Sequence, residues 1–230
     1  MRPCHRIAPA ARSAVSFEIL RWVAILAAAL SLAACAVGNT YNYRLPGMAL
    51  PVQGNAAIGL VVADRRPYIL SGNKSPDFVG LQRGGFGNPF DVRTQSGGPM
   101  ATDMSEALQN ALAAKGYRVT PIQGNADDLA ALGRKAGELG LQRVAVLRIA
   151  EWKTDTYAST TLYFDLKLLI VDPAGALVAE NAVNGNTVIG GGMPSTIAAL
   201  AQQAFENKIG QLFYPPQIAA ALNGGMERRK

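Results

Sequence analysis

Residues 158–184, ASTTLYFDLKLLIVDPAGALVAENAVN, carry the pattern that is most informative about the fold. Apolar side chains occupy every second position of its first half, at Leu162, Phe164, Leu166, Leu168 and Ile170. This alternation is typical of a strand that buries one face and exposes the other. The four residues 172–175, Asp-Pro-Ala-Gly, then predict a turn, and residues 177–184 predict the returning strand of an antiparallel hairpin.

On both sides of this hairpin, strand patterns alternate with helix patterns along the chain. The unbroken apolar run at 57–64 is typical of a strand covered on both faces. A helical repeat follows at 100–115 with Gly116 as its stop signal, and Asn125 is expected to cap a second helix. The predicted strands are 57–64, 117–120, 144–152, 158–170 and 177–184, and the predicted helices are 100–115, 125–139 and 195–213.

The order β-α-β-α-β-β-β-α predicts an α+β fold, a single mixed-sheet domain with its helices mainly on one face. Helices must cover an apolar sheet face, and this arrangement does so with the fewest layers. We expect this domain at 56–216, after an extended tether at 35–55 that is rich in Gly and Pro. Residues 217–230 are expected to form a C-terminal tail.

The N-terminus has the pattern of a secretory signal peptide over residues 1–34. Four arginines precede an apolar run from Trp22 to Leu30, and Ser31-Leu32-Ala33-Ala34-Cys35 follows. The apolar run is shorter than the roughly 20 residues that a membrane-spanning helix needs. We therefore expect the segment to be removed.

The tetrapeptide Leu32-Ala33-Ala34-Cys35 resembles the lipobox of bacterial lipoproteins, in which the cysteine is acylated, for example by palmitate. The alternative is an ordinary signal peptide with a coincidental cysteine. Several acyl chains on Cys35 would hold the protein at a membrane, since each buried methylene contributes about 0.8 kcal/mol. Ala36 is not the aspartate that usually signals inner-membrane retention, so the resemblance implies the periplasmic face of the outer membrane in a Gram-negative envelope.

The composition of the mature chain excludes several function classes. Both Cys4 and His5 precede Cys35, so the mature chain has no histidine and its one cysteine is the expected acyl acceptor. Histidine-based triads, cysteine nucleophiles, disulfides and thiolate or imidazole metal sites are excluded. Removal of residues 1–34 leaves 18 of 22 basic and 15 of 16 acidic residues. A net charge of about +3 without a basic run gives no indication of nucleic-acid binding, and we expect neither a metal nor another cofactor.

A resemblance to a family rests on four stretches. These are the lipobox, the strand end Val62-Ala63-Asp64-Arg65-Arg66-Pro67, the glycine-rich segment after it, and Leu112-Ala113-Ala114-Lys115-Gly116-Tyr117. Together they resemble the YajG-like lipoproteins of Gram-negative envelopes. The resemblance implies a binding or assembly role rather than catalysis, and it brings no catalytic residues with it.

The segment 65–99 carries the candidate partner-binding residues, Arg65, Arg66, Tyr68, Phe86 and Phe90. Connections of such length are usually functional or disordered. The two arginines could bind a carboxylate or phosphate, although strand-end charges more often pair with each other. The phenylalanines could fold back over the sheet, but the glycines around them favour exposure to a partner.

Two function classes stay open from the sequence. The first is a non-enzymatic, membrane-anchored lipoprotein that binds an envelope protein or a cell-wall polymer. The second is a histidine-free hydrolase that acts on envelope glycan with two carboxylates. Two carboxylates that face one cleft would favour the hydrolase.

Overall fold

A computed structural model describes residues 20–23 and 39–224 of the chain. The expected signal peptide, the lipobox and Cys35 lie outside the described residues, apart from 20–23. Within the described ranges, no helix is both long and apolar enough to cross a membrane.

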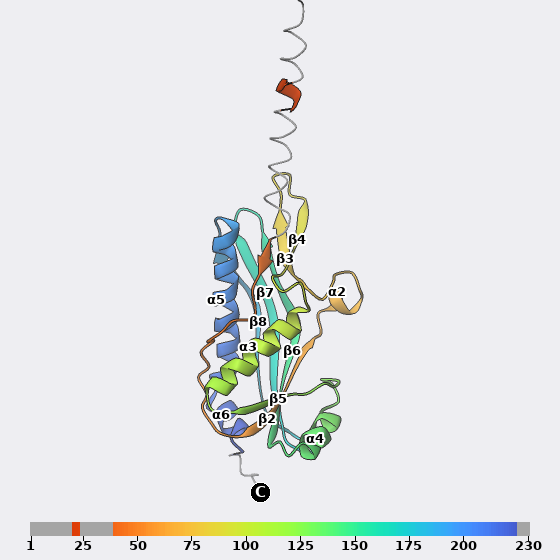
Figure 1. Ribbon diagram of the computed structural model, residues 1–230, viewed down its shortest axis with the longest axis vertical. Coiled ribbons are helices and arrows are strands. Elements are labelled where there is room, and N and C mark those ends of the chain that lie inside the picture. Colours follow the sequence, from red (N-terminus) through yellow and green to blue (C-terminus); the bar gives the residue numbers. More distant parts are fainter. Residues whose placement is uncertain (1–19, 24–38, 225–230) are drawn as a thin grey trace, which may run out of the picture.

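Among the described residues, eight strands form one mixed sheet (Figure 1). Its order is β1-β4-β3-β6-β2-β5, and β7 and then β8 continue from the other edge of β6. The pairs β1/β4, β2/β5, β2/β6 and β3/β6 are parallel, whereas β3/β4, β6/β7 and β7/β8 are antiparallel. The bounds are β1 Thr40–Tyr41, β2 Ala57–Asp64, β3 Phe78–Arg83, β4 Pro89–Thr94, β5 Arg118–Pro121, β6 Arg143–Thr156, β7 Thr160–Val171 and β8 Leu177–Gly190.

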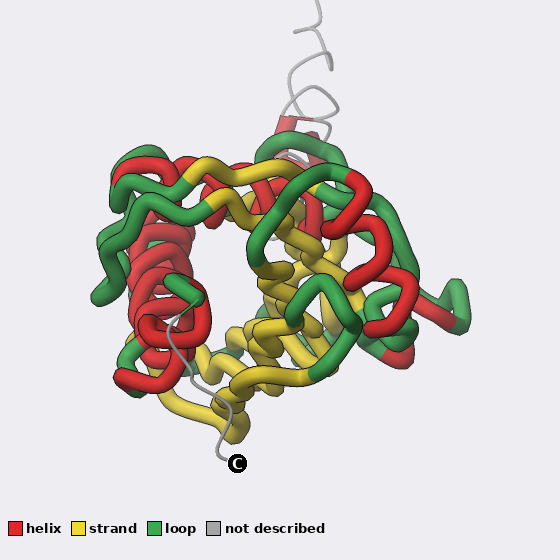
Figure 2. The backbone as a smooth tube through the Cα atoms, turned by 90° about the horizontal axis from the view of Figure 1, so that it is seen from below, coloured by secondary structure: helices red, strands yellow, loops and turns green. Residues whose placement is uncertain are grey.

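The helices lie mainly on one face of this sheet, as the sequence predicts. In the view from below (Figure 2), the strands form a curved wall and the long helix α5 lies across from part of it. Helices α3, α5 and α6 contribute to the large hydrophobic core, and α4 packs on a smaller cluster. The bounds are α2 Pro67–Leu70, α3 Met100–Ala114, α4 Leu129–Glu138, α5 Pro194–Phe213 and α6 Pro216–Leu222.

The predicted element order is confirmed, and the residue patterns explain why. Along α3, the apolar side chains at helical spacing are all buried, at Met100, Met104, Ala107, Leu108, Ala111 and Leu112. Gly116 ends this helix with a φ of +95°, and a Cβ there would lie 2.4 Å from the carbonyl oxygen of Gly54. The second helix begins later than expected, because Asp128 rather than Asn125 caps it by accepting from the Ala131 amide.

The prediction of a tether at 35–55 is wrong for its described part, 39–55. Thr40 and Tyr41 pair with β4 as strand β1, and the segment buries Tyr41, Tyr43, Leu45, Met48, Leu50 and Val52 in the large core. The Tyr43 hydroxyl accepts a 2.9 Å hydrogen bond from the indole of Trp152. Arg44 bonds the buried carboxylate of Asp103 at 2.7 Å and so joins the segment to α3. Apolar burial outweighs the flexibility that Gly and Pro suggest.

Two further predictions need correction. The C-terminal tail expected at 217–230 begins as helix α6, whose Ile218, Ala221 and Leu222 are buried. The segment 65–99 is not one long loop, because it contains α2 and the antiparallel hairpin of β3 and β4. This hairpin extends the sheet and provides the edge on which β1 pairs.

Candidate functional site

The residues that the sequence singles out first, Arg65 to Tyr68, lie at a fork in the sheet. Strand β6 pairs with β2 as far as Ile149 and with β3 from Thr154 onward, along the same edge. Between these two stretches, no strand in the described part of the chain pairs with that edge of β6. Side chains from the segment after β2 occupy this gap.

Arg66 closes the fork. Its fully buried guanidinium donates to the carbonyl oxygens of Phe78 at 2.6 Å and Trp152 at 3.1 Å, which belong to the two strands that separate there. It also forms two bonds to the carboxylate of Asp64, of 2.6 and 2.9 Å. Burial opposes the charge on Arg66, but the contact with Asp64 outweighs it and holds the pKa of the guanidinium above its ordinary value.

Tyr68 completes the same cluster. Its hydroxyl donates a 2.5 Å hydrogen bond to Glu151, and Lys153 lies 3.2 Å from the other oxygen of that carboxylate. Burial, together with the hydrogen bond to Glu151, raises the pKa of Tyr68 far above its usual value, so the phenol stays protonated. Glu151 also accepts from the amide of Trp152. The predicted partner-binding residues Arg66 and Tyr68 are therefore engaged with the protein itself, and buried Arg66 is not accessible to a partner.

Arg65 points to a separate hollow on the surface. It forms an ion pair with Asp127 and donates to Asn125 at 2.8 Å. The hollow has a volume of about 440 Å³, and its lining residues are Arg65, Leu70, Asp127, Arg148, Ala150, Asp165 and Lys167. Lys167 pairs across the sheet with Glu180 at 2.9 Å, not with Asp165.

Phe86 and Phe90 differ in their surroundings. Phe90 is half-buried on β4, whereas Phe86, at the tip of the β3–β4 hairpin, is as exposed as in an extended peptide. A Cβ on Gly85 or Gly87 would meet no atom within 4 Å, so there is open space beside the residues on both sides of Phe86. The exposure expected for both phenylalanines holds only for Phe86.

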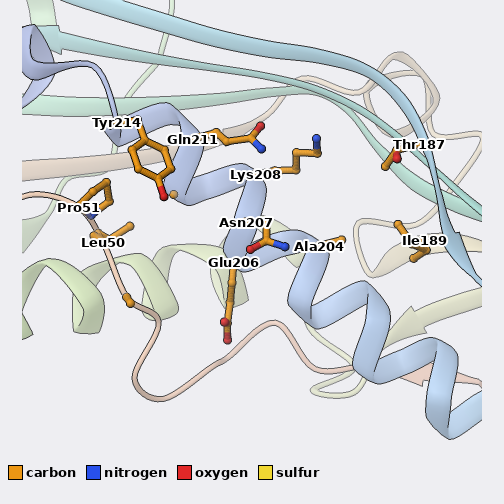
Figure 3. Close-up of a pocket in the computed structure, with 12 residues that line it drawn as sticks. Leu50, Pro51, Thr187, Ile189, Ala204, Glu206, Asn207, Lys208, Gln211 and Tyr214 are labelled. Atoms are coloured by element: carbon orange, nitrogen blue, oxygen red, sulfur yellow. The ribbon is translucent and has the colours of Figure 1, made fainter.

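A groove along α5 is the larger concave feature, and sequence reasoning missed it (Figure 3). It has a volume of about 640 Å³ and runs between the N-terminal segment, α5 and the end of β8. Its lining contains one ammonium group, that of Lys208, and one carboxylate, that of Glu206. The Nζ atom of Lys208 lies 4.2 Å from the ring centroid of Phe164. The lining residues are Ala49, Leu50, Pro51, Thr187, Ile189, Ala204, Glu206, Asn207, Lys208, Gly210, Gln211 and Tyr214.

Other candidate features do not form a site. Trp152 is fully buried, so it does not share a surface patch with exposed Tyr157. In the described part of the chain, no three His, Cys, Asp or Glu side chains come close enough together to hold a metal ion. No signal in the sequence marks the groove, because its walls come from three segments that are far apart along the chain.

Comparisons with known proteins show a similarity of fold only. No family model matches the sequence, and no curated protein matches it. A crystal structure of a Xanthomonas campestris protein described as DUF330 is similar, with a TM-score of 0.51 and 11% identity over 80% of this chain and 95% of that chain. At this identity, the similarity shows a common fold and nothing about activity.

Two weaker similarities are to proteins with more specific descriptions. The PelC dodecamer from Paraburkholderia phytofirmans gives a TM-score of 0.41 at 15% identity, over 74% of this chain and 95% of that chain. Lipoprotein GNA1162 from Neisseria meningitidis gives 0.35 at 16% identity, over 68% of this chain and 99% of that chain. Such scores carry no argument about function. Lipoproteins occur among the similar structures, but none of those named here is described as YajG-like, so that finer resemblance stays a prediction.

Proposed function

We propose that this protein is a lipoprotein anchored through Cys35 on the periplasmic face of the outer membrane, with a non-enzymatic binding or assembly role in the envelope. The groove along α5 is the proposed partner site, and an envelope protein or a cell-wall polymer is the proposed partner. The lipobox supports the anchor, and Ala36 after Cys35 supports the outer membrane.

The composition of the groove is the observation that carries the binding role. Its lining joins apolar side chains to the amides of Asn207 and Gln211, which are exposed one helical turn apart. Amides on a partly apolar surface suit hydrogen bonding to a peptide or a sugar. Because Glu206 is the lone carboxylate in the lining, the groove lacks the carboxylate pair that a glycan hydrolase uses.

The hydrolase alternative has one observation in its favour. Asp127 and Asp165 both line the hollow beside Arg65, so two carboxylates do face one depression. Asp127, however, is engaged by Arg65 and lies 3.5 Å from the guanidinium of Arg148. A carboxylate held by two arginines is poorly placed to attack a sugar or to give up a proton, so we favour the binding role.

Site-specific photocrosslinking in native membranes tests the proposal. A photoreactive residue at Asn207 or Gln211 should capture a defined envelope component, which mass spectrometry or glycan analysis then identifies. The same residue at Lys135, exposed on α4 and outside the groove lining, is the matched control. Equal capture at all three positions would contradict a site in the groove. Cleavage of envelope glycan by the purified protein, lost in Asp165→Asn, would establish the alternative.

A further inference from the structure

Four large apolar side chains are exposed at one end of the domain, and we call them the apolar rim. They are Phe86, Tyr157, Val188 and Met193, with exposed fractions of 103%, 63%, 65% and 71%. Each comes from a different place in the fold: the β3–β4 tip, the β6–β7 turn, the end of β8 and the residue before α5. Large apolar side chains that are exposed together on one part of a monomeric protein often mark an interaction site.

Strand pairing shows that these four positions share one end. Strands β3 and β6 run parallel with Gln82 opposite Thr156, so the hairpin tip and the turn with Tyr157 point the same way. The end of β8 joins them, because Gly190 pairs with Thr160 at the start of β7. In Figure 1 the hairpin tip, this turn and the beginning of α5 all lie at the upper end of the domain.

The chain also enters the domain at this end. Strand β1 runs parallel to β4 with Thr40 opposite Arg93, and β4 starts at the hairpin tip. Four peptide units separate Cys35 from Asn39, and they span at most about 14 Å. Lipid on Cys35 and the apolar rim can therefore reach the same plane.

The charges beside the rim do not oppose contact with an apolar phase. The nearest cation on the hairpin, Arg83, forms two bonds of 2.6 and 2.8 Å to the carboxylate of Asp155. This neutral pair costs less to bring near a bilayer than a single charge would. Aromatic side chains such as Tyr157 are enriched where lipid headgroups meet water.

We propose that the apolar rim docks on the bilayer that holds the acyl chains of Cys35, with Phe86 inserted into the headgroup region. The proposal rests on the lipid anchor of the proposed function and adds a second, protein-borne contact. Together the two contacts would make the domain extend from the membrane surface along its long axis. A second copy of the chain could also cover such a rim, and the test separates the two occupants.

The mature chain makes a clean test possible, because its one cysteine is the expected acyl acceptor. An introduced cysteine can then be labelled alone with an environment-sensitive fluorophore. We would label Phe86→Cys, Tyr157→Cys and Val188→Cys in the lipidated full-length protein. Leu139→Cys and Leu177→Cys, about half exposed at the other end of the domain, are matched controls.

The labelled proteins are reconstituted into phosphatidylethanolamine–phosphatidylglycerol vesicles, with and without nitroxide-bearing lipid. Rim probes should show blue-shifted emission that the nitroxide quenches, and control probes should show neither change. A blue shift without quenching means that a second copy covers the rim and overturns the proposal. Probes that stay in water overturn it too. Flotation with the vesicles reports the anchor separately: floating protein with unchanged rim probes leaves the anchor standing, whereas protein that does not float removes both.

Discussion

Neighbouring arginines at the end of β2 should differ sharply in their contribution to stability. Arg66→Met removes the guanidinium that closes the fork but keeps an unbranched apolar stem of similar length. The Asp64 carboxylate, only 13% exposed, then loses two bonds, and the carbonyls of Phe78 and Trp152 lose their side-chain donor. Removing one partner from a buried ion pair costs about 3–5 kcal/mol.

Arg65→Met is the matched control one residue earlier. Arg65 is partly exposed and its partner Asp127 is mostly exposed, so its loss should cost no more than about 1 kcal/mol. The difference of about 3 kcal/mol between the variants corresponds to roughly 6–12 °C in melting temperature for a domain of this size.

Urea unfolding followed by circular dichroism, with a thermal scan beside it, measures both variants. Asp64→Asn combined with Arg66→Met should recover part of the loss, because no unpaired carboxylate then remains at the fork. Equal losses for Arg65→Met and Arg66→Met, or a loss below about 1 kcal/mol for Arg66→Met, would refute the structural role given to Arg66.

Four further substitutions have expected outcomes. Gly210→Ala in α5 should stabilise the protein by about 0.5–1 kcal/mol, since a Cβ there meets nothing within 4 Å. Gly133→Ala in α4 should destabilise it, since the Cβ would lie 2.4 Å from the amide nitrogen of Gly175. Chemical unfolding measures both changes in stability, and two changes of equal sign would contradict the packing. Burial opposes the charge on Asp77, but hydrogen bonds from Ser75 and Arg93 hold the pKa of its carboxyl below the ordinary 3.8. The ionised carboxylate therefore stabilises the folded protein above pH 3.8, and this stabilisation is lost as the pH falls through the lower folded pKa. Asp77→Asn should thus be less stable than the parent at pH 7, and melts at decreasing pH should show this difference shrinking below pH 3.8. Finally, palmitate labelling in cells should vanish in Cys35→Ser, and retained label would place the acyl group elsewhere.

Local patterns in the sequence predict most of the architecture, because periodicity reports which face of each element is buried. Every predicted strand and helix is present, and the apolar stripe of α5 is buried at Ile197, Ala201, Phe205 and Ile209. The N-terminal segment misled for a physical reason. Its Gly and Pro residues suggest flexibility, while its buried side chains lie in a core with distant residues such as Trp152, more than a hundred residues from Tyr43. No local window holds that information.

The candidate site shows the same limit more strongly. Arginine is rarely buried, so a strand-end arginine such as Arg66 reads as a surface charge. Arg66 is buried because the long strand β6 pairs with β2 and then with β3 along the same edge. This pairing is a property of the sheet topology. The groove along α5 depends likewise on distant segments. Phe86 was predictable as exposed because glycines flank it on both sides, and neighbouring backbone alone decides that outcome.

Pairing of β1 with β4 changes how the domain would sit on a membrane. A flexible tether of about 20 residues would let the domain wander roughly 25 Å from its anchor. Asn39 directly precedes β1, and the four peptide units between Cys35 and Asn39 span at most about 14 Å. If the apolar rim docks as proposed, helix α5 would begin at the membrane end of the domain and extend about 30 Å away from it. The groove residues from Ala204 to Tyr214 lie on its distal half, so a partner in the periplasm could reach them while the apolar rim stays on the bilayer.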